Sequence, residues 1–498
     1  MPYIPRQYDS AKDFRSQKAI PNIVDDMDAQ RIHSYQLYDD FYYNRPETFC
    51  VTVRENSDTE IYLPSTKKIV NATARFLAVD FNFTLKGGSI DQVENFLHNL
   101  FAREEIMRRF IRGKRSMLTR GDLVWYITAD PDKPEGKRLT VNTIHPGNVF
   151  PIEHPDDDTR VIGWHIVDLV SDPRDKDDPD KQVARRQTYR RNASGEITYE
   201  AATFEIGTWD DRNLKKDEIK PVSIIKKQFT LPREITAFPV YLVPNHEPDG
   251  SSWGMSLVAG MEYIINALNQ SITYEDLTLV LQGLGLYVST AGPPIDAATG
   301  KAGKYKLHPG NVVEIEHDDD FKRVTGVTSL SPFQEHINAL DRWGMDGCGV
   351  PDMATGSIEV SVAQSGIALA LKMGPIIAEN SDRELALGGK WDQIGYDLIN
   401  GWMPAYEGIR SDTEFKAIFG DPMPINREAY INELIQLSVM NLITLDEVRE
   451  KLEVIGYENT AGVVEQLYEQ MERRAISNSG GAFMEETPNP QEEQQYSE

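Results

Sequence analysis

The sequence is poor in cysteine and short of basic residues. Its 498 residues include only two cysteines, Cys50 and Cys348. Two cysteines so far apart provide neither a disulfide framework nor a Cys-based zinc site, and they fit a reducing cytoplasm. The 52 Lys and Arg residues stand against 78 Asp and Glu, which gives a formal charge of −26. That balance argues against a protein whose main task is to grip nucleic acid.

Long apolar runs are also missing. The longest, Gly366 to Ala378, is shorter than the ~18 residues that a membrane span needs, and it contains Lys372 and Pro375. The first twenty residues lack the apolar segment of a secretory signal. We therefore expect a soluble protein without a membrane partner, with about three domains at roughly 150 residues each.

Motifs of common catalytic sites are absent. The segment GPPIDAATGKA at 292–302 has the wrong spacing for a phosphate loop, and Ala302 stands where Mg²⁺ would need a hydroxyl group. Neither HExxH nor GxSxG occurs. His317, followed by three aspartates at 318–320, could hold a metal ion, but such a run is more typical of a polar turn. We predict no catalytic residue, no cofactor and no metal.

Apolar periodicity predicts alternating helical and β-rich parts, and hence an α+β fold. Residues 91–117 have the pattern of one amphipathic helix, and 121–245 that of an antiparallel β region with a solvated acidic loop at 171–181. A helix uninterrupted by proline is predicted from Ser252 to Gln282. A small β module at 283–331 and a second helix from Ser331 follow.

The remaining third of the chain is predicted to be mainly helical. A Gly-rich segment, Gly347 to Ala363, precedes a helix that begins at Ser365 and that Gly374 and Pro375 should kink.

Three short helices are expected at 430–440, 445–454 and 460–474. A capping box of Thr444 and Glu447 should begin the second of them. The tail beyond Ile476 has five Glu and no basic residue, so we expect disorder there.

One basic run interrupts the acidic chain. Arg108, Arg112 and Arg115 fall on one face of the predicted helix at 91–117, and four more basic residues accompany them: Arg103, Arg109, Lys114 and Arg120. This run could contact DNA or an acidic surface of a neighbouring copy. A solvated face with local salt bridges is the commonest explanation of such a pattern.

Three segments resemble the portal proteins of tailed double-stranded DNA bacteriophages. They are RGKRSMLTRGDLVWYIT at 112–128, the run FPVYLVPNHEPDGSSWGMSLVAGMEYIINALNQSITYEDLTLVLQGLGLYV at 238–288, and SGIALALKMGPIIAENSDRE at 365–384. The order of elements extends the resemblance to residues ~40–475. It implies an α+β portal fold and a ring, usually of twelve copies, at one capsid vertex, through which DNA passes.

The resemblance also assigns parts of the chain to the regions of a portal subunit. It implies a helix-rich and β-rich wing at 1–245, a first stem helix at 246–282, a small β-containing clip at 283–331, a second stem helix at 332–346, a tunnel loop at 347–364, a kinked channel helix and wing return at 365–425, an α-helical crown at 426–475 and a disordered acidic tail at 476–498.

Candidate site residues follow from this assignment. The tunnel loop would present Asp352, Met353, Thr355, Ser357 and Glu359 to the channel, with Gly374 and Pro375 forming the helix kink behind it. Lys301, Lys304 and Lys306 of the clip would contact DNA or an acidic partner. The loop has no Lys or Arg, which departs from the basic contacts expected in such channels. An acidic wall fits a conduit, because a wall that neutralised phosphates would retain the DNA.

The implied partners are other copies of the chain, the major capsid and scaffolding proteins, the large terminase and a head–tail adaptor. Double-stranded DNA would pass through without sequence-specific contacts. The implied location is the capsid vertex of a virion assembled in the host cytoplasm, and the implied role is structural and not enzymatic. Two alternatives stay open: another ring-forming head scaffold protein, and a carboxylate-dependent hydrolase with its acid and base in the β region.

Overall fold

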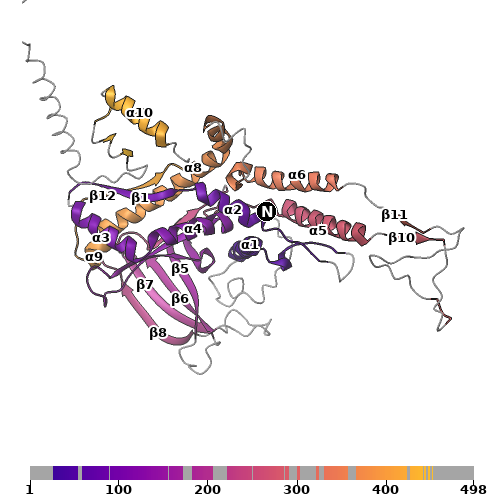
Figure 1. The fold of residues 1–498 in the computed structure, drawn as a ribbon. Coiled ribbons are helices and arrows are strands. Elements are labelled where there is room, and N and C mark those ends of the chain that lie inside the picture. Colours follow the sequence, from indigo (N-terminus) through magenta and orange to yellow (C-terminus); the bar gives the residue numbers. More distant parts are fainter. Residues whose placement is uncertain are drawn as a thin grey trace, which may run out of the picture. The chain divides into compact units, whose positions relative to one another are not determined.

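The computed structural model describes most of the chain between residues 26 and 452. The described residues are 26–53, 59–88, 90–154, 156–171, 182–205, 221–248, 251–284, 286–290, 300–302, 321–324, 330–356, 366–422, 427–440, 442–444, 447–448 and 451–452. The chain forms two compact units, Met1–Pro422 and Met423–Glu498. Figure 1 shows the elements of both.

Four helices form the N-terminal part of the first unit: α1 (Asp26–Tyr42), α2 (Ser65–Phe76), α3 (Ile90–Arg103) and α4 (Ile106–Arg120). The prediction of one helix over 91–117 is wrong. The backbone of Glu105 is left-handed, with φ of 50°, which ends α3 and redirects the chain into α4. Gly121, with φ of 102°, ends α4 by donating its N–H to the carbonyl of Met117.

The predicted antiparallel β region is confirmed and forms two sheets. The first has the order β3-β2-β9 and consists of β2 (Asp122–Ala129), β3 (Leu139–Ile144) and β9 (Val240–Pro244). The second has the order β4-β5-β6-β7-β8 and consists of β4 (Val149–His154), β5 (Asp157–Ser171), β6 (Gln182–Arg191), β7 (Ile197–Glu205) and β8 (Pro221–Thr230). The acidic loop lies outside the described residues, apart from Ser171 at the end of β5.

The long helix that follows is shorter than predicted. Helix α5 runs from Glu262 to Leu284 and does not begin at Ser252. Residues 251–261 are not helical and include a turn at 257–260, where Gly260 has φ of 89°, which is incompatible with a continuous right-handed helix. The next helix, α6 (Ser331–Gly347), begins where predicted and packs beside α5 (Figure 1).

A small hairpin connects the two helices. Strands β10 (Leu286–Ser289) and β11 (Phe321–Val324) are paired antiparallel, with Leu286 opposite Val324. This confirms β structure at both ends of the predicted module. Most residues between the two strands, including 303–320, lie outside the described part, and the His317 cluster is among them.

The last part of the first unit contains a long kinked helix, α8 (Gly366–Asp397), with Pro375 inside it (Figure 1). A π-helical turn (Leu398–Trp402), α9 (Met403–Tyr406) and strand β12 (Glu414–Gly420) follow. Strand β12 pairs antiparallel with β1 (Val79–Lys86), so it returns to the N-terminal part of the unit.

The core of the first unit is centred on a cluster of aromatic rings. Trp391 of α8 lies 4.8 Å from Trp125 of β2 and 4.7 Å from Phe81 of β1, measured between ring centroids. Phe81 in turn stacks on Phe110 of α4 at 4.8 Å. Full burial of such a ring stabilises the folded state by about 1.5–3 kcal/mol. Because the rings come from α4, α8, β1 and β2, their contacts join these elements in one core.

The second unit begins with α10 (Arg427–Val439). The predicted capping box after it is confirmed: the Thr444 N–H donates to Glu447 Oε2 at 2.8 Å, and the Glu447 N–H donates to Thr444 Oγ1 at 3.3 Å. The predicted helix at 460–474 and the acidic tail lie outside the described residues.

Candidate functional site: the helix pair α5 and α6 and the loop after it

Helices α5 and α6 pack against each other, and two glycines of α6 face the start of α5. A Cβ atom on Gly347 would lie 2.8 Å from Met261 Sδ, and one on Gly344 would lie 3.6 Å from Ile264. At α6, an ion pair between Lys68 Nζ and Asp341 Oδ2 at 2.8 Å connects the pair to α2. These contacts place the end of α6 beside the start of α5.

An extended segment, residues 50–53 and 59–63, lies along α5, and we call it the strap. Polar side chains of α5 hold its backbone. Asn266 Oδ1 accepts from the N–H of Cys50 at 2.9 Å, and Gln270 both accepts from Thr52 at 2.7 Å and donates to its carbonyl at 2.9 Å. Further along, Asn269 Oδ1 accepts from Leu63 at 2.9 Å and Thr273 Oγ1 from Ile61 at 3.1 Å.

These side chains do for the strap what a neighbouring strand does in a sheet, since they satisfy backbone groups that would otherwise lack partners. Apolar contacts add to them, because Phe49 just before the strap packs with Ile265 of α5 and with Leu37 and Phe41 of α1. Our sequence analysis did not anticipate this role of α5. The only available signal was the Asn and Gln content of a helix that otherwise appeared apolar.

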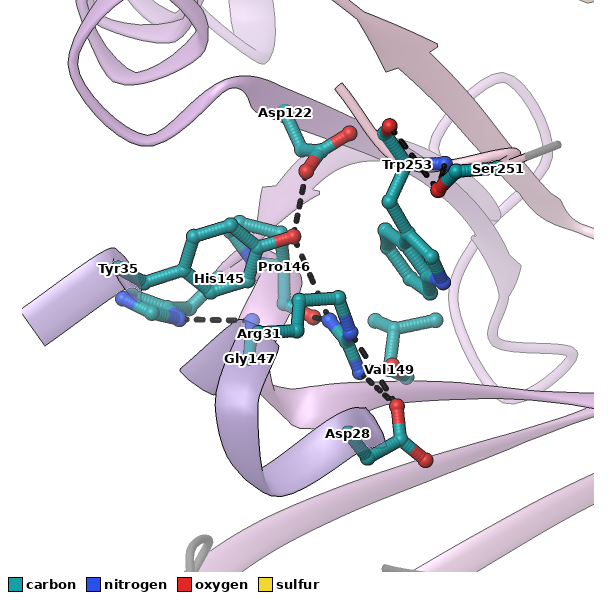
Figure 2. A network of polar contacts seen from close by, with 10 residues as sticks. All are labelled: Asp28, Arg31, Tyr35, Asp122, His145, Pro146, Gly147, Val149, Ser251 and Trp253. Carbon is teal, nitrogen blue, oxygen red and sulfur yellow. Dashed lines mark hydrogen bonds and ion pairs between the residues drawn. The ribbon is translucent and has the colours of Figure 1, made fainter. Parts of the chain in front are cut away.

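A buried polar network fixes the chain just before α5 (Figure 2). The guanidinium of Arg31 stacks over the Trp253 ring at 3.7 Å and donates to the carbonyls of Pro146 at 2.9 Å and Val149 at 3.1 Å. It also pairs with Asp28 at 2.6 Å. Helix α1, the start of β4 and the segment leading to α5 therefore meet at one cation.

Asp122 is the second centre of this network. Its Oδ2 accepts from the Tyr35 hydroxyl, and its Oδ1 accepts from the Gly254 N–H at 2.9 Å. Burial raises the pKa of Asp122 to about 6, although both hydrogen bonds act in the opposite direction. Burial, together with the Asp122 carboxylate, raises the pKa of Tyr35 well above 10, so Tyr35 remains a donor.

The loop after α6 begins with buried residues. Cys348, Val350 and Ala354 are buried, and residues 352–355 form a 3-10 turn in which Thr355 Oγ1 donates to the Asp352 carbonyl at 2.7 Å. Asp352 is exposed, whereas Met353 and Thr355 are half-buried. The structure thus brings these three candidate residues together in one turn. Ser357 and Glu359 lie outside the described residues.

The other candidate positions are separate from this turn. Pro375 is exposed on α8, and a Cβ atom on Gly374 would meet nothing within 4 Å. Lys301 is exposed, while Lys304 and Lys306 lie outside the described residues. The contacts that these residues make with DNA or a partner stay predictions.

Several members of the basic run on α3 and α4 have internal partners. Arg109 pairs with Glu104 at 3.2 Å, Arg120 with Asp39 at 2.9 Å, and the buried Lys114 donates to the Leu77 carbonyl at 2.7 Å. Arg103 donates to the Gly136 carbonyl at 2.6 Å. The explanation by local ion pairs therefore holds for Arg109 and Arg120, while Lys114 and Arg103 also bind backbone carbonyls. Arg108, Arg112 and Arg115 are exposed.

Within the described residues, no group of three or more His, Cys, Asp or Glu side chains could hold a metal ion. A small cavity of about 150 Å³ is lined by Glu234, Asp397 and Trp402, among others. Its carboxylates have partners, because Asp397 accepts from Tyr241 at 2.9 Å and Glu234 pairs with Arg410 at 3.7 Å. No helix in the described part of the chain is long and apolar enough to cross a membrane.

Comparison with known proteins gives structural matches only. No protein-family profile and no curated protein matches the chain. Two similar chains have 15% identity and a TM-score of 0.41. One lies in the neck of a native gene transfer agent (GTA) particle computed with C12 symmetry, and the match covers 80% of this chain and 91% of that one. The other lies in the neck of an empty GTA particle computed with C6 symmetry, and the match covers 86% of this chain and 94% of that one. A third lies in the virion of a native GTA particle, with 15% identity, a TM-score of 0.39 and coverage of 86% and 91%. The chain is thus similar in structure to neck components of gene transfer agent particles.

Proposed function

We propose that this protein is a portal subunit. It is a structural protein that forms a ring of about twelve copies at one vertex of a capsid. The observation that carries the proposal is the order of elements. A β-rich region leads into α5, a hairpin, the returning helix α6, a loop, the proline-containing helix α8 and a strand that pairs with β1. This is the order that the sequence resemblance to phage portal proteins implies.

The charge of the helix pair supports a conduit for DNA. Helix α6 contains three acidic residues and one arginine, and α5 contains no Lys or Arg. The loop after α6 adds the exposed Asp352. A surface of this charge makes few attractive contacts with phosphate, so DNA can slide past it without the counterion release that accompanies tight binding.

Exposed apolar side chains support assembly into a ring. Trp343 of α6 is 57% exposed, and the neighbouring residues Leu279 and Val280 of α5 are 47% and 50% exposed. Side chains of this size on adjacent helices are typical of surfaces that another protein covers. A head-to-tail contact between identical copies closes into a ring when the rotation between them divides a full turn.

The experiment that tests the proposal is native mass spectrometry of the purified protein, together with negative-stain images. We expect a closed ring of about a dozen 56.4 kDa copies with a central hole. A strictly monomeric protein at micromolar concentration and physiological salt would contradict the proposal.

A matched pair of variants sharpens this test. Trp343→Asp introduces a charge on α6, and Ile418→Asp does so on β12, where Ile418 is 42% exposed. We expect the first variant to lose the ring and the second to keep it, with both remaining folded by circular dichroism. Equal assembly of the two would show that α6 does not take part in the ring.

Further parts of the proposal concern partners and location. The ring would contact the major capsid and scaffolding proteins, and its β10–β11 hairpin would bind the large terminase during packaging and a head–tail adaptor afterwards. The protein would then be part of the virion. DNA packaging by particles that carry the variants above distinguishes a portal from another ring-forming head protein. If the protein is a portal, the variant that forms no ring should yield capsids without DNA.

A further inference from the structure

Two helices of this acidic protein contain basic residues and no acidic ones. Helices α2 and α4 together contain nine Lys and Arg residues and no acidic residue, in a chain of net charge −26. The two helices are in contact. Part of this charge has partners inside the unit: Arg109, Arg120 and Lys68 form ion pairs, and Lys114 donates to a backbone carbonyl. Arg108, Arg112 and Arg115 are exposed.

One exposed strip of α4, which we call the α4 outer face, combines this charge with apolar side chains. It consists of Met107, Arg108, Ile111, Arg112 and Arg115. Met107 and Ile111 are each 44% exposed and lie four residues apart, so they form one row. Arg108, Arg112 and Arg115 form the adjacent row. Arg108 has an exposed partner in Glu105, and Arg112 reaches Thr143 Oγ1 at 3.3 Å.

This combination favours a protein partner over nucleic acid. A phosphate backbone would pair with the arginines but would leave the row of Met107 and Ile111 without an apolar surface to cover it. A protein surface with carboxylates beside apolar side chains would cover both rows. Arg and Met are also enriched at protein interfaces.

The chain itself carries such a surface on the second half of α5. We call Glu275, Asp276, Leu279 and Val280 the α5 outer face. Leu279 and Val280 are exposed and the two carboxylates are half-buried, with no basic residue on the same helix. Glu275 and Leu279 form one row and Asp276 and Val280 the next, so each row carries an acidic and an apolar residue.

We propose that the α4 outer face binds the α5 outer face of a second copy of this chain. Charge complementarity selects the pair, because one helix has no acidic residue and the other has no basic residue. The arginines of one face and the apolar residues of the other are exposed within one chain, so the contact is between copies. Two different faces of the same chain make a head-to-tail contact, which continues from copy to copy until the ring closes.

This inference rests on the proposed ring, and it names the surfaces that hold neighbouring copies together. It also gives the exposed arginines of α4 an acidic partner. Part of the attraction is electrostatic, so the contact should weaken as salt rises.

Charge reversal tests the contact. We expect Arg112→Glu with Arg115→Glu to raise the protein concentration at half-assembly at least tenfold, as measured by sedimentation velocity. Glu275→Lys with Asp276→Lys should do the same. The chain that carries all four substitutions should recover assembly, because the charges are exchanged across the contact. Lys67→Glu with Arg75→Glu on α2 is the matched control, since it makes the same change in net charge at exposed positions and should assemble like the unaltered protein.

The possible outcomes separate the inference from the proposed function. If the unaltered protein forms no ring, the proposed function fails. If it forms a ring and the α4 variant assembles equally well, or the fourfold variant does not recover, the inference is wrong and the function stands. An α4 variant that assembles normally but releases packaged DNA would assign this face to nucleic acid and also overturn the inference. Circular dichroism checks that each variant is folded.

Discussion

Single residues at the junction between α4, β2 and the chain before α5 decide how closely these segments approach. Asp122 joins Tyr35 of α1 to the backbone of Gly254, and Gly254 lies against Gly121 at the end of α4. A buried carboxyl group and two glycines therefore meet at one point. Substitutions of Asp122 and Gly254 should therefore change the free energy of unfolding.

Replacing Asp122 by Asn should remove one source of pH dependence. Burial raises the pKa of Asp122 from 3.8 to about 6. Between these values the folded state keeps the proton and the unfolded state loses it, so the free energy of unfolding falls as pH rises through this window, by on the order of 2–3 kcal/mol. Asn does not titrate. Relative to the unaltered protein, Asp122→Asn should therefore be more stable near neutral pH than near pH ~4.

Melting temperatures of both proteins, measured across this pH range, check the prediction. Other groups titrate equally in the two proteins, so the difference between the two melting temperatures isolates Asp122. A difference that does not change with pH would show that Asp122 titrates as it does in water.

Gly254→Ala should be strongly destabilising. A Cβ atom at this position would lie 2.2 Å from the Gly121 carbonyl oxygen and 2.7 Å from the Asn245 nitrogen. Both are backbone atoms, so no change of side-chain rotamer can relieve the clash. We expect a loss of about 2–4 kcal/mol in the free energy of unfolding, measured by urea denaturation. Gly136→Ala makes a useful contrast. Its Cβ would meet nothing within 4 Å, and only its φ of 78° should cost stability. Equal losses in the two variants would contradict the clash.

At the level of elements, the kink of α8 is the feature most open to testing. A proline inside a helix costs ~3 kcal/mol or more unless the helix bends. Gly374 and Pro375 have little packing to lose, since Pro375 is exposed and nothing surrounds the Gly374 Cβ position. The pair can therefore be replaced without damage to the core.

Gly374→Ala with Pro375→Ala should straighten α8 and leave the fold intact. If the bend aims the loop after α6 at a channel, rings and empty capsids should still form, but packaging should fail or packaged DNA should leak. Packaging and retention of DNA at the normal level would show that the bend serves only the packing of the helix.

The hairpin between α5 and α6 allows a second test at this scale. Strands β10 and β11 pair with each other, so removal of residues 292–304 between them should leave both helices in place. We expect such a deletion to keep the ring and to abolish binding of the adaptor or the packaging motor, measured by co-sedimentation. Loss of the ring itself would mean that the hairpin belongs to the contact between copies.

For the whole molecule, the division into two units leads to a prediction about truncation. The main apolar core consists of residues before Pro422, from Val70 to Ala417. A chain that ends at Pro422 should therefore fold and melt within about 2 °C of the full chain under conditions that keep both monomeric. A large fall in melting temperature would show that the second unit contributes to the stability of the first.

The sequence by itself determined the features that depend on local chemistry. Short runs rich in β-branched and aromatic residues predicted the antiparallel β region, Ser331-Pro332 predicted the start of α6, and Thr444 with Glu447 predicted a capping box that the structure contains. Each depends on residues within a few positions of one another, so a local pattern is sufficient.

Only the tertiary structure decided the rest. Glu105 breaks a continuous apolar stripe into α3 and α4, and residues 251–261 are not helical, with Gly254 lying against Gly121 and Gly260 at positive φ. The strap lies on α5 through side chains more than 200 residues away in sequence. The basic run divides into inward and outward members according to what packs against α4. Contacts between distant segments set all of these outcomes, and no local pattern in the sequence records them.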